Sequence, residues 1–512
     1  MIRYTPQNQL SLEMFKNPFD IILDKDNRWV KLSEVVPWDE LANIYCQKLD
    51  FLSGRKSVDV RLVIGALIVK HKLKLDDRGA IDMIQENMYI QYFCGYHSFN
   101  SKRPFDPSLF VDIRKRLGNK EFDEFNKIVI ESAEGLKPKR SRIMPPKGSA
   151  IGNTEGQLPI EKKQLPNKGR LKLDATVADQ EITYPTDLKL LNTGREELER
   201  LIDIMHQTVG KGEKPRTYRR DAHRAFIDMA KKKNKGNKQI RKGIKVQLQY
   251  VRRDLKIMDG LYEKLKTMKL EKIILERSDR ELIKTIHEMY MQQLHMYKNN
   301  ENSHPNRIVN LYQPWVRPMP RGKDGSRTEF GSKINVSEVE GFCRINRLDW
   351  NNYNEAGDLE LQVEAYRQLY GRYPKEVLAD QIYLNRNNRK YLKLRNIEIV
   401  GKPLGRPKAL EQTSLQKWRK KKIAAQRNHI EGKFGQAKRG YGLNNVRARL
   451  STTSESWIGA IFFVMNLTRL LKLTDQATNF YFQIIFRLKM YYKLSISSII
   501  KHPLQIIKYM FA

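Results

Sequence analysis

Two short apolar runs that lie far apart in the chain constrain the fold most, because each carries an aspartate. In residues 171–177, Leu, Leu, Ala and Val alternate with Lys, Asp174 and Thr. This period of two predicts a β-strand with Asp174 on the face opposite the leucines. The run Val377-Leu-Ala-Asp380 is short and apolar, which is typical of a buried strand. Residues 188–300 are helical in pattern, so we expect one sheet that a helical insertion interrupts.

Residues 1–136 are predicted to form an all-α N-terminal domain. Its clearest helix has Asp106 as N-cap and Pro107 at the first helical position, and it ends at Gly118. Further helices are expected around 58–68 and 81–92. Three consecutive basic residues crowd the clearest helix: Arg114, Lys115 and Arg116. They indicate either the solvated face of a plain helical bundle or a helix-turn-helix-like module that docks on duplex DNA.

The remainder is predicted to be a linker at 137–170, an α/β domain at 171–474 and a tail at 475–512 without an assigned function. Strands are expected at 308–316, 329–336, 341–348, 377–380 and 397–400. Helices are expected at 359–369, 389–395, 411–439 and 455–472. A helix that precedes the fourth strand favours a mixed α/β sheet with flanking helices.

The charge of the chain indicates a polyanionic partner. Lys and Arg number 95 against 58 acidic residues, a net charge of +37. Nucleic acid is the commonest partner of so basic a chain, although a ribosome-assembly or membrane-surface protein has a similar charge. Three widely spaced cysteines, Cys46, Cys94 and Cys343, fit a reducing cytosol. The most apolar uncharged run considered, 476–486, is too short to span a membrane, so no membrane partner is expected.

A third acidic residue completes a candidate catalytic set. Arg427, Glu431 and Lys438 lie at offsets of four and seven, on one face of an expected helix. Two strand aspartates and a helix glutamate supply the hard oxygen ligands with which two Mg²⁺ ions promote phosphodiester chemistry. Taken singly, Asp380 could cap the next turn, and Arg427 with Glu431 could be an ordinary surface pair worth about 0.3–0.5 kcal/mol.

Over residues 30–475 the chain resembles bacterial insertion-sequence transposases of the DDE type, which have a ribonuclease-H-like catalytic domain. Arg427-x3-Glu431-x6-Lys438 is the most specific signature of this resemblance. The other segments that carry it are Asp59–Leu67, Pro104–Phe110, Leu173–Val177, Ile182–Leu188, Ala379–Tyr383, Asn385–Arg389, Tyr441-Gly-Leu and Met465-Asn-Leu.

The resemblance implies Asp174, Asp380 and Glu431 as the catalytic metal ligands, with two Mg²⁺ ions, or Mn²⁺ as a substitute. Arg427 and Lys438 would position DNA phosphates. The implied partners are double-stranded DNA, both the terminal inverted repeats and the target, and a second copy of the chain, in the bacterial cytoplasm at the nucleoid. Related enzymes carry a tyrosine where this chain has Ala424, which leaves a hairpin step open.

Two alternatives remain open from the sequence. A decayed or repurposed copy would be a DNA-binding protein that shows salt-sensitive binding without metal-dependent nicking. A different nuclease on the same ribonuclease-H-like fold would cut branched DNA or RNA without forming strand-transfer products.

Overall fold

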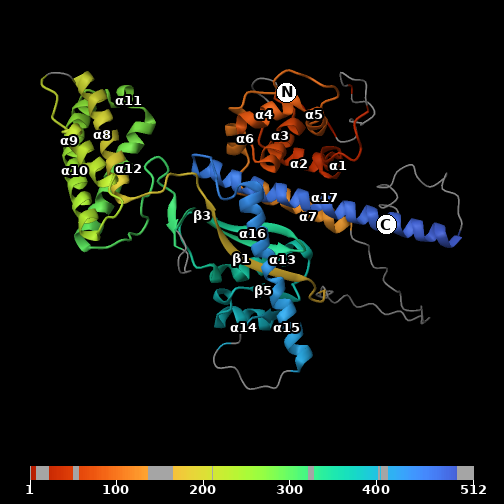
Figure 1. Cartoon of the computed structure of the whole chain (residues 1–512). Coiled ribbons are helices and arrows are strands. Elements are labelled where there is room, and N and C mark those ends of the chain that lie inside the picture. Colours follow the sequence, from red (N-terminus) through yellow and green to blue (C-terminus); the bar gives the residue numbers. More distant parts are fainter. Residues whose placement is uncertain are drawn as a thin grey trace, which may run out of the picture.

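The computed structural model describes residues 2–6, 16, 22–49, 57–136, 165–209, 212–320, 328–401, 404 and 413–492. Most of the expected linker and the end of the tail lie outside these residues. Figure 1 shows three parts: a group of N-terminal helices, a sheet with its own helices, and a separate helical bundle. A long C-terminal helix runs between the N-terminal helices and the sheet (Figure 1).

Seven helices form the N-terminal part: α1 (Arg28–Val35), α2 (Trp38–Cys46), α3 (Val60–Leu73), α4 (Asp77–Glu86), α5 (Met88–Phe93), α6 (Leu109–Arg116) and α7 (Asn119–Gly135). The start expected at Asp106 is two residues early, because its Oδ1 accepts from Ser108 N (2.9 Å) and closes a turn before α6. Gly118 is the N-cap of α7, where its N–H donates to Glu121. The helix expected over 81–92 is two helices, since Asn87 caps the second.

The sheet contains β1 (Arg170–Asp179), β2 (Arg317–Met319), β3 (Glu329–Val339), β4 (Phe342–Asp349), β5 (Glu376–Ala379) and β6 (Glu398–Val400). Its order is β2-β3-β1-β5-β6, with β4 also paired to β3. The β1–β3, β2–β3 and β3–β4 pairs are antiparallel, whereas β1–β5 and β5–β6 are parallel. The chain is therefore a mixed α/β protein, as expected.

The strand expected at 308–316 is wrong. Asn310 Oδ1 accepts from the backbone N–H groups of Tyr312 and Gln313, which folds this segment into a turn, and only β2 follows it. Its apolar residues Ile308 and Leu311 are buried in the core of the helical bundle and not against the sheet. An apolar run alone does not tell which core it joins.

Helices cover both faces of the sheet. They are α13 (Leu359–Tyr370), α14 (Arg386–Leu394), α15 (Ser414–Gln426), α16 (Asn428–Tyr441) and α17 (Ser451–Tyr492), with short 3-10 turns at Glu355–Asp358 and Gln381–Tyr383. Leu171 and Leu173 of β1 pack with Leu359 and Val363 of α13 on one face. On the other face Ile334 and other sheet residues join one core with α16, α17 and the N-terminal helices.

A buried contact ties the N-terminal helices to the sheet through α17. Phe463 of α17 lies against Phe122 and Phe125 of α7, at ring-centroid distances of 6.2 and 5.1 Å. Asn466, also on α17, donates to Asn126 of α7 (2.8 Å) and to the backbone carbonyl of Cys343 in β4 (2.7 Å). These helices and the sheet therefore share one interior.

The helical bundle occupies the residues for which the sequence predicts a helical insertion. It consists of α8 (Asp187–Val209), α9 (Arg219–Ala230), α10 (Asn237–Thr267), α11 (Glu271–Ile274) and α12 (Arg277–Asn299). Its apolar residues form a core of their own. The chain enters at Asp187 and leaves at Arg307, and these two side chains form an ion pair.

One stretch of α17, Ser451–Tyr481, is long and apolar enough to cross a membrane by length and composition alone. Of its most apolar window, 78% is buried within this structure. Buried core helices of soluble proteins can have the same length and composition, so this stretch is weak evidence for a membrane span.

Candidate active site

The register of β1 and β5 brings the two strand aspartates together. The strands are parallel, and Leu173 pairs with Ala379, so the next residues are Asp174 and Asp380. Asp380 Oδ1 accepts from Gln381 N (2.7 Å), which caps the 3-10 turn Gln381–Tyr383. Capping uses one oxygen of a side chain that is 58% exposed, so Asp380 remains accessible to a ligand.

The third carboxylate, Glu431, lies in the first turn of α16. The sequence predicts one continuous helix over 411–439; residues 411–412 lie outside the described residues, and the helix is divided at Arg427, whose backbone is still right-handed helical. The Arg427 guanidinium lies 3.1 Å from Glu431 Oε1 and 3.9 Å from Asp380 Oδ1. One cation thus links α16 to the end of β5, and it also forms with Glu431 the i,i+4 pair that the sequence left open as an alternative.

The other two carboxyl groups of the cluster affect Asp174 electrostatically. The pKa of Asp174 is raised to about 6, mainly by partial burial and also by the charges of Asp380 and Glu431, while the Ala175 N–H and Arg427 act in the opposite direction. The backbone N–H of Ala175 donates to Asp174 Oδ1 (2.8 Å). A raised pKa in a carboxylate group means that its negative charge is incompletely compensated.

The donor chemistry of this cluster fits a hard divalent cation, but the present arrangement is not a metal cage. Carboxylate oxygens are the ligands that Mg²⁺ prefers, and the excess negative charge at Asp174 favours a cation. Within the described residues, however, no group of three or more His, Cys, Asp or Glu side chains is placed to hold a metal ion. Arg427 lies between Asp380 and Glu431, where it supplies the positive charge.

Lys438 is engaged by protein carboxylates. Its Nζ lies 2.8 Å from Glu329 Oε1 and 3.4 Å from Asp179 Oδ2, and the side chain is 17% exposed. The family resemblance implies instead that Lys438 contacts a DNA phosphate. In the structure Lys438 fastens α16 to the start of β3 and the end of β1.

The three basic residues of α6 have different surroundings. Arg114 is buried, donates two hydrogen bonds of 2.8 Å to Asp77, and lies 5.5 Å from the Trp457 ring. The expectation that it belongs to a solvated basic face is wrong, because Asp77 and Trp457 enclose it. Lys115 is exposed and Arg116 donates to the Tyr45 hydroxyl (3.1 Å). Of the three, Lys115 is the most open to a DNA partner.

A buried polar network beneath the cluster was not anticipated from the sequence. Asn335 Oδ1 accepts from the Tyr383 hydroxyl (2.8 Å) and from Gln362 (2.9 Å), and its amide donates to Asp358 (2.8 Å). This network holds the turn that follows Asp380. Tyr383 belongs to the segment Ala379–Tyr383 noted above, but nothing in the sequence marks Asn335, a polar residue in the middle of a strand.

Two protein-family models match separate parts of the chain. The family model Transposase DDE domain matches residues 377–468, which include Asp380, Arg427 and Glu431 but not Asp174. The model Transposase domain (DUF772) matches residues 17–116 of the N-terminal part. A curated relative, "Uncharacterized protein ORF8 in nfe locus" of Rhizobium meliloti, is 26% identical over 181 residues, which are 35% of this chain and 74% of the relative. No solved structure matches the chain. The two family matches, one toward each end of the chain, indicate an insertion-sequence transposase.

Proposed function

We propose that this protein binds the ends of an insertion sequence and catalyses metal-dependent DNA cleavage and strand transfer with Asp174, Asp380 and Glu431. The observation that carries the proposal is that Asp380 and Glu431 both lie at Arg427 while the strand register places Asp174 beside Asp380. Residues more than 200 positions apart meet there through the β1–β5 register and the start of α16. A sheet that is antiparallel on one side of β1 and parallel on the other supports a ribonuclease-H-like catalytic domain.

In this mechanism the three carboxylates hold the metal ions, and the nearby Arg427 and Lys438 side chains orient the DNA phosphate and helix α16. Two Mg²⁺ ions bound by Asp174, Asp380 and Glu431 would neutralise phosphate charge and activate the attacking oxygen. Arg427 already faces Asp380 and Glu431, so its planar fork is placed to hold a phosphate beside the cluster. Lys438 keeps α16, and with it Glu431, against β1 and β3.

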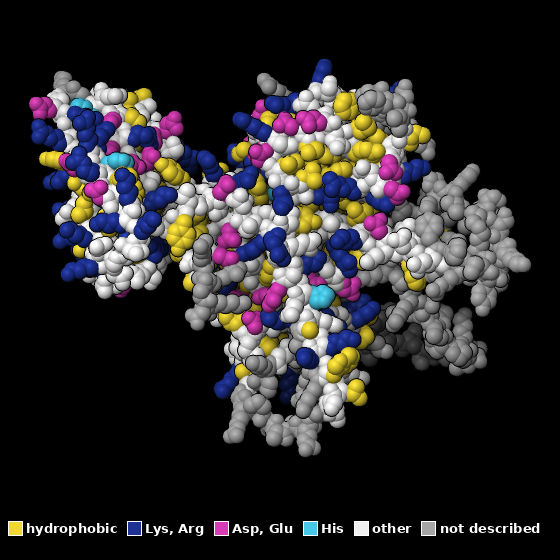
Figure 2. All heavy atoms as spheres, viewed as in Figure 1, with side chains coloured by type: hydrophobic (Ala, Val, Ile, Leu, Met, Phe, Trp, Pro, Cys, Tyr) yellow, Lys and Arg dark blue, Asp and Glu magenta, His cyan; other side chains and the backbone are white. Residues whose placement is uncertain are grey.

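The DNA partner follows from charge. The net charge of +37 favours a polyanion, and residues 211–242 of the insertion hold 13 Lys and Arg against three acidic residues. Figure 2 shows Lys and Arg side chains over much of the insertion and of the remaining surface on this face. Two ends of an element must be held together for strand transfer, so a homodimer on terminal inverted repeats and target DNA is the expected assembly.

The test compares cleavage with binding. Purified protein, Mg²⁺ and a duplex that contains the terminal inverted repeat should give nicked and strand-transfer products. Asp380→Asn should bind the duplex as wild type does but reduce cleavage to background, because a cation ligand is lost. Asp228→Asn, at an exposed aspartate of α9, removes the same charge far from the cluster and should leave cleavage unchanged.

Equal cleavage by Asp380→Asn and wild type would refute the assignment of the site. Binding without any nicking by the wild type would identify an inactive or repurposed copy. Nicking without strand-transfer products would indicate another nuclease on the same fold.

A further inference from the structure

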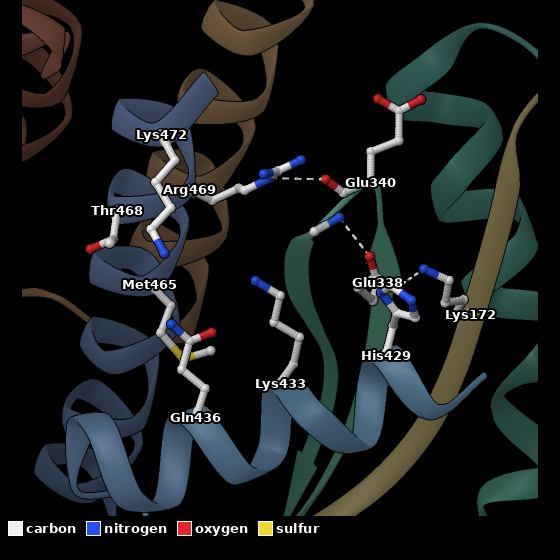
Figure 3. A pocket seen from close by; sticks show the side chains of 11 residues that line it. Lys172, Glu338, Glu340, His429, Lys433, Gln436, Met465, Thr468, Arg469 and Lys472 are labelled. Atoms are coloured by element: carbon white, nitrogen blue, oxygen red, sulfur yellow. Dashed lines mark hydrogen bonds and ion pairs between the residues drawn. The ribbon is translucent and has the colours of Figure 1, made fainter. Parts of the chain in front are cut away.

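A hollow of about 600 Å³ lies beside α16 (Figure 3). Successive residues of an α-helix are turned by about 100°, so the buried Ile430 and Phe434 separate Arg427 and Glu431 on one flank from Lys433 on the other. The charged residues that line the hollow are Lys172, Glu338, Glu340, Lys433, Arg469 and Lys472. They come from β1, β3 and its turn, α16 and α17.

Both carboxylate oxygens of Glu338, in the wall of the hollow, have partners within the protein. Glu338 Oε2 forms an ion pair with Lys172, and both side chains are nearly buried, at 2% and 10% exposure. Glu338 Oε1 accepts from the backbone N–H of Gly341 (2.5 Å). Lys172 and Glu338 are therefore paired with each other. Burial lowers the pKa of Lys433, and the charge of Glu338, which still reaches Lys433, acts in the opposite direction.

Three cations remain. Neither Lys433 nor Lys472 forms an ion pair or hydrogen bond with any residue that the structure describes. Arg469 is fixed by a hydrogen bond from its Nε to the backbone carbonyl of Glu340 (3.1 Å). In Figure 3 the Lys433 and Lys472 side chains extend into the space between α16, α17 and the β3–β4 turn, and the Glu340 carboxylate points away from it.

Gly341 lets Arg469 lie against this turn. Its φ of +95° belongs to the left-handed region, and a Cβ there would lie 2.7 Å from Arg469 Nε. The position of the guanidinium therefore depends on the absence of a side chain. A guanidinium held in one position beside two lysine ammonium groups is a suitable arrangement for binding phosphate oxygens.

We propose that this hollow, the α16–α17 pocket, binds backbone phosphates of a DNA strand that continues past the cut site. The proposal rests on the proposed function for its ligand and extends it to a new contact. Lys172 in the wall precedes Asp174 by two residues on the same face of β1, a step of about 7 Å. The wall of the pocket and the acidic cluster are therefore two residues apart along β1, on opposite flanks of α16, and a strand that crosses α16 from the cluster would reach the pocket. Like charges that have no ion-pair partner among the described residues favour such a polyanion.

The experiment measures the salt dependence of duplex binding by fluorescence anisotropy in EDTA, where no cleavage occurs. The double variant Lys433→Gln/Lys472→Gln should bind more weakly, and its slope of log K against log [salt] should be shallower by about 1.8, since each phosphate contact contributes about 0.9. Lys433→Arg/Lys472→Arg keeps both charges and should restore the slope.

Lys390→Gln/Lys393→Gln serves as the matched control, because it removes two exposed charges from α14, which is not part of the pocket. The control should keep the wild-type slope. An unchanged slope in the pocket variant, or an equal change in the control, would overturn the proposal. Nicking by the wild type in Mg²⁺ is scored separately, so loss of the proposed enzymatic function and loss of the pocket are distinguishable.

Free phosphate is the other source of this ligand chemistry. Wild type and pocket variant are therefore also titrated with inorganic phosphate at constant ionic strength while their melting temperatures are followed. Stabilisation of the wild type alone, together with an unchanged DNA slope in the variant, would assign the pocket to a free anion and overturn the strand contact. No phosphate effect, together with the shallower slope, supports the strand.

Discussion

The N-terminal helices α1–α7 and the inserted helices α8–α12 are both helical in sequence pattern, but they are joined to the sheet differently. The first group shares one core with β3, β4, α16 and α17. The second has a core of its own, and the chain enters and leaves it at the Asp187–Arg307 ion pair. The N-terminal helices are thus part of the same packed unit as the sheet, whereas the insertion has its own core.

The difference teaches where basic residues serve packing and where they serve a partner. In the N-terminal part Lys70 and Arg114 are buried against Asp77 and the Trp457 ring. In the insertion the run of lysines Lys231, Lys232 and Lys233 is exposed. The type of a single residue does not show whether it is buried, because burial depends on the partner that the fold provides.

The largest expected effect tests the shared core. Phe463→Ala removes a fully buried ring from the junction of α17 and α7 and should destabilise the fold by about 3–5 kcal/mol. Hydrogen–deuterium exchange should show protection lost in α7 and β4 together. Met258→Ala, in the core of the insertion, should reduce protection only within α8–α12. Loss of protection in the insertion after Phe463→Ala would contradict the separation of the two cores.

A second prediction concerns the buried cation of α6. Arg114→Ala leaves Asp77 with only Lys70, at 3.2 Å, and should reduce the free energy of unfolding of the N-terminal part by about 3 kcal/mol. Lys115→Ala removes an exposed neighbour and should change stability by less than about 0.5 kcal/mol. Thermal unfolding measures both. A larger destabilisation by Lys115→Ala than by Arg114→Ala would contradict the burial of Arg114 and the exposure of Lys115 on α6.

The smallest expected effect lies in the insertion. Asp254 is fully buried on α10, neither carboxyl oxygen has a hydrogen-bond partner among the described residues, and burial, then the charge of Glu199, raises its pKa to about 7. A raised pKa means that the folded state binds the proton more tightly than the unfolded state. The contribution of Asp254 to the free energy of unfolding is therefore complete below about pH 4 and is lost as the pH rises through 7.

Asp254→Asn keeps the shape and removes this titration. Relative to the variant, wild-type α8–α12 should therefore lose about 1–3 kcal/mol between pH 4 and 7, the cost of a buried polar group without a partner. Exchange protection of α10, measured in both proteins at each pH, gives the difference, in which the other titrating groups cancel. A difference that does not vary with pH would show that Asp254 is solvated or paired in solution.

Local patterns explain which parts of the fold were predictable. Strand β1 follows from the alternation at 171–177, and α13 from its apolar spacing and the Gly371 that ends it in a left-handed conformation. Residues 308–316 were wrongly predicted because an apolar run suits a strand and a loop packed on a helical core equally well. The break at Arg427 was also missed, because nothing in the local sequence interrupts the helical pattern.

The candidate site shows the same division. The residue types and the spacing of Arg427 and Glu431 were visible in the sequence, and so was their chemistry. The engagement of Lys438 by Asp179 and Glu329, and the network around Asn335, were not visible, because their partners are distant in the chain.

The sequence by itself determined the periodicities, the excess of positive charge and the acidic residues suited to a divalent cation, since these depend on neighbouring residues and on composition. Only the tertiary structure decided that Asp174 lies beside Asp380, that Arg427 faces two of the carboxylates, and that Arg114 is buried while Lys433 and Lys472 have no ion-pair partner among the described residues. Charge pairing and burial act through space, so they are fixed by which distant segments pack together.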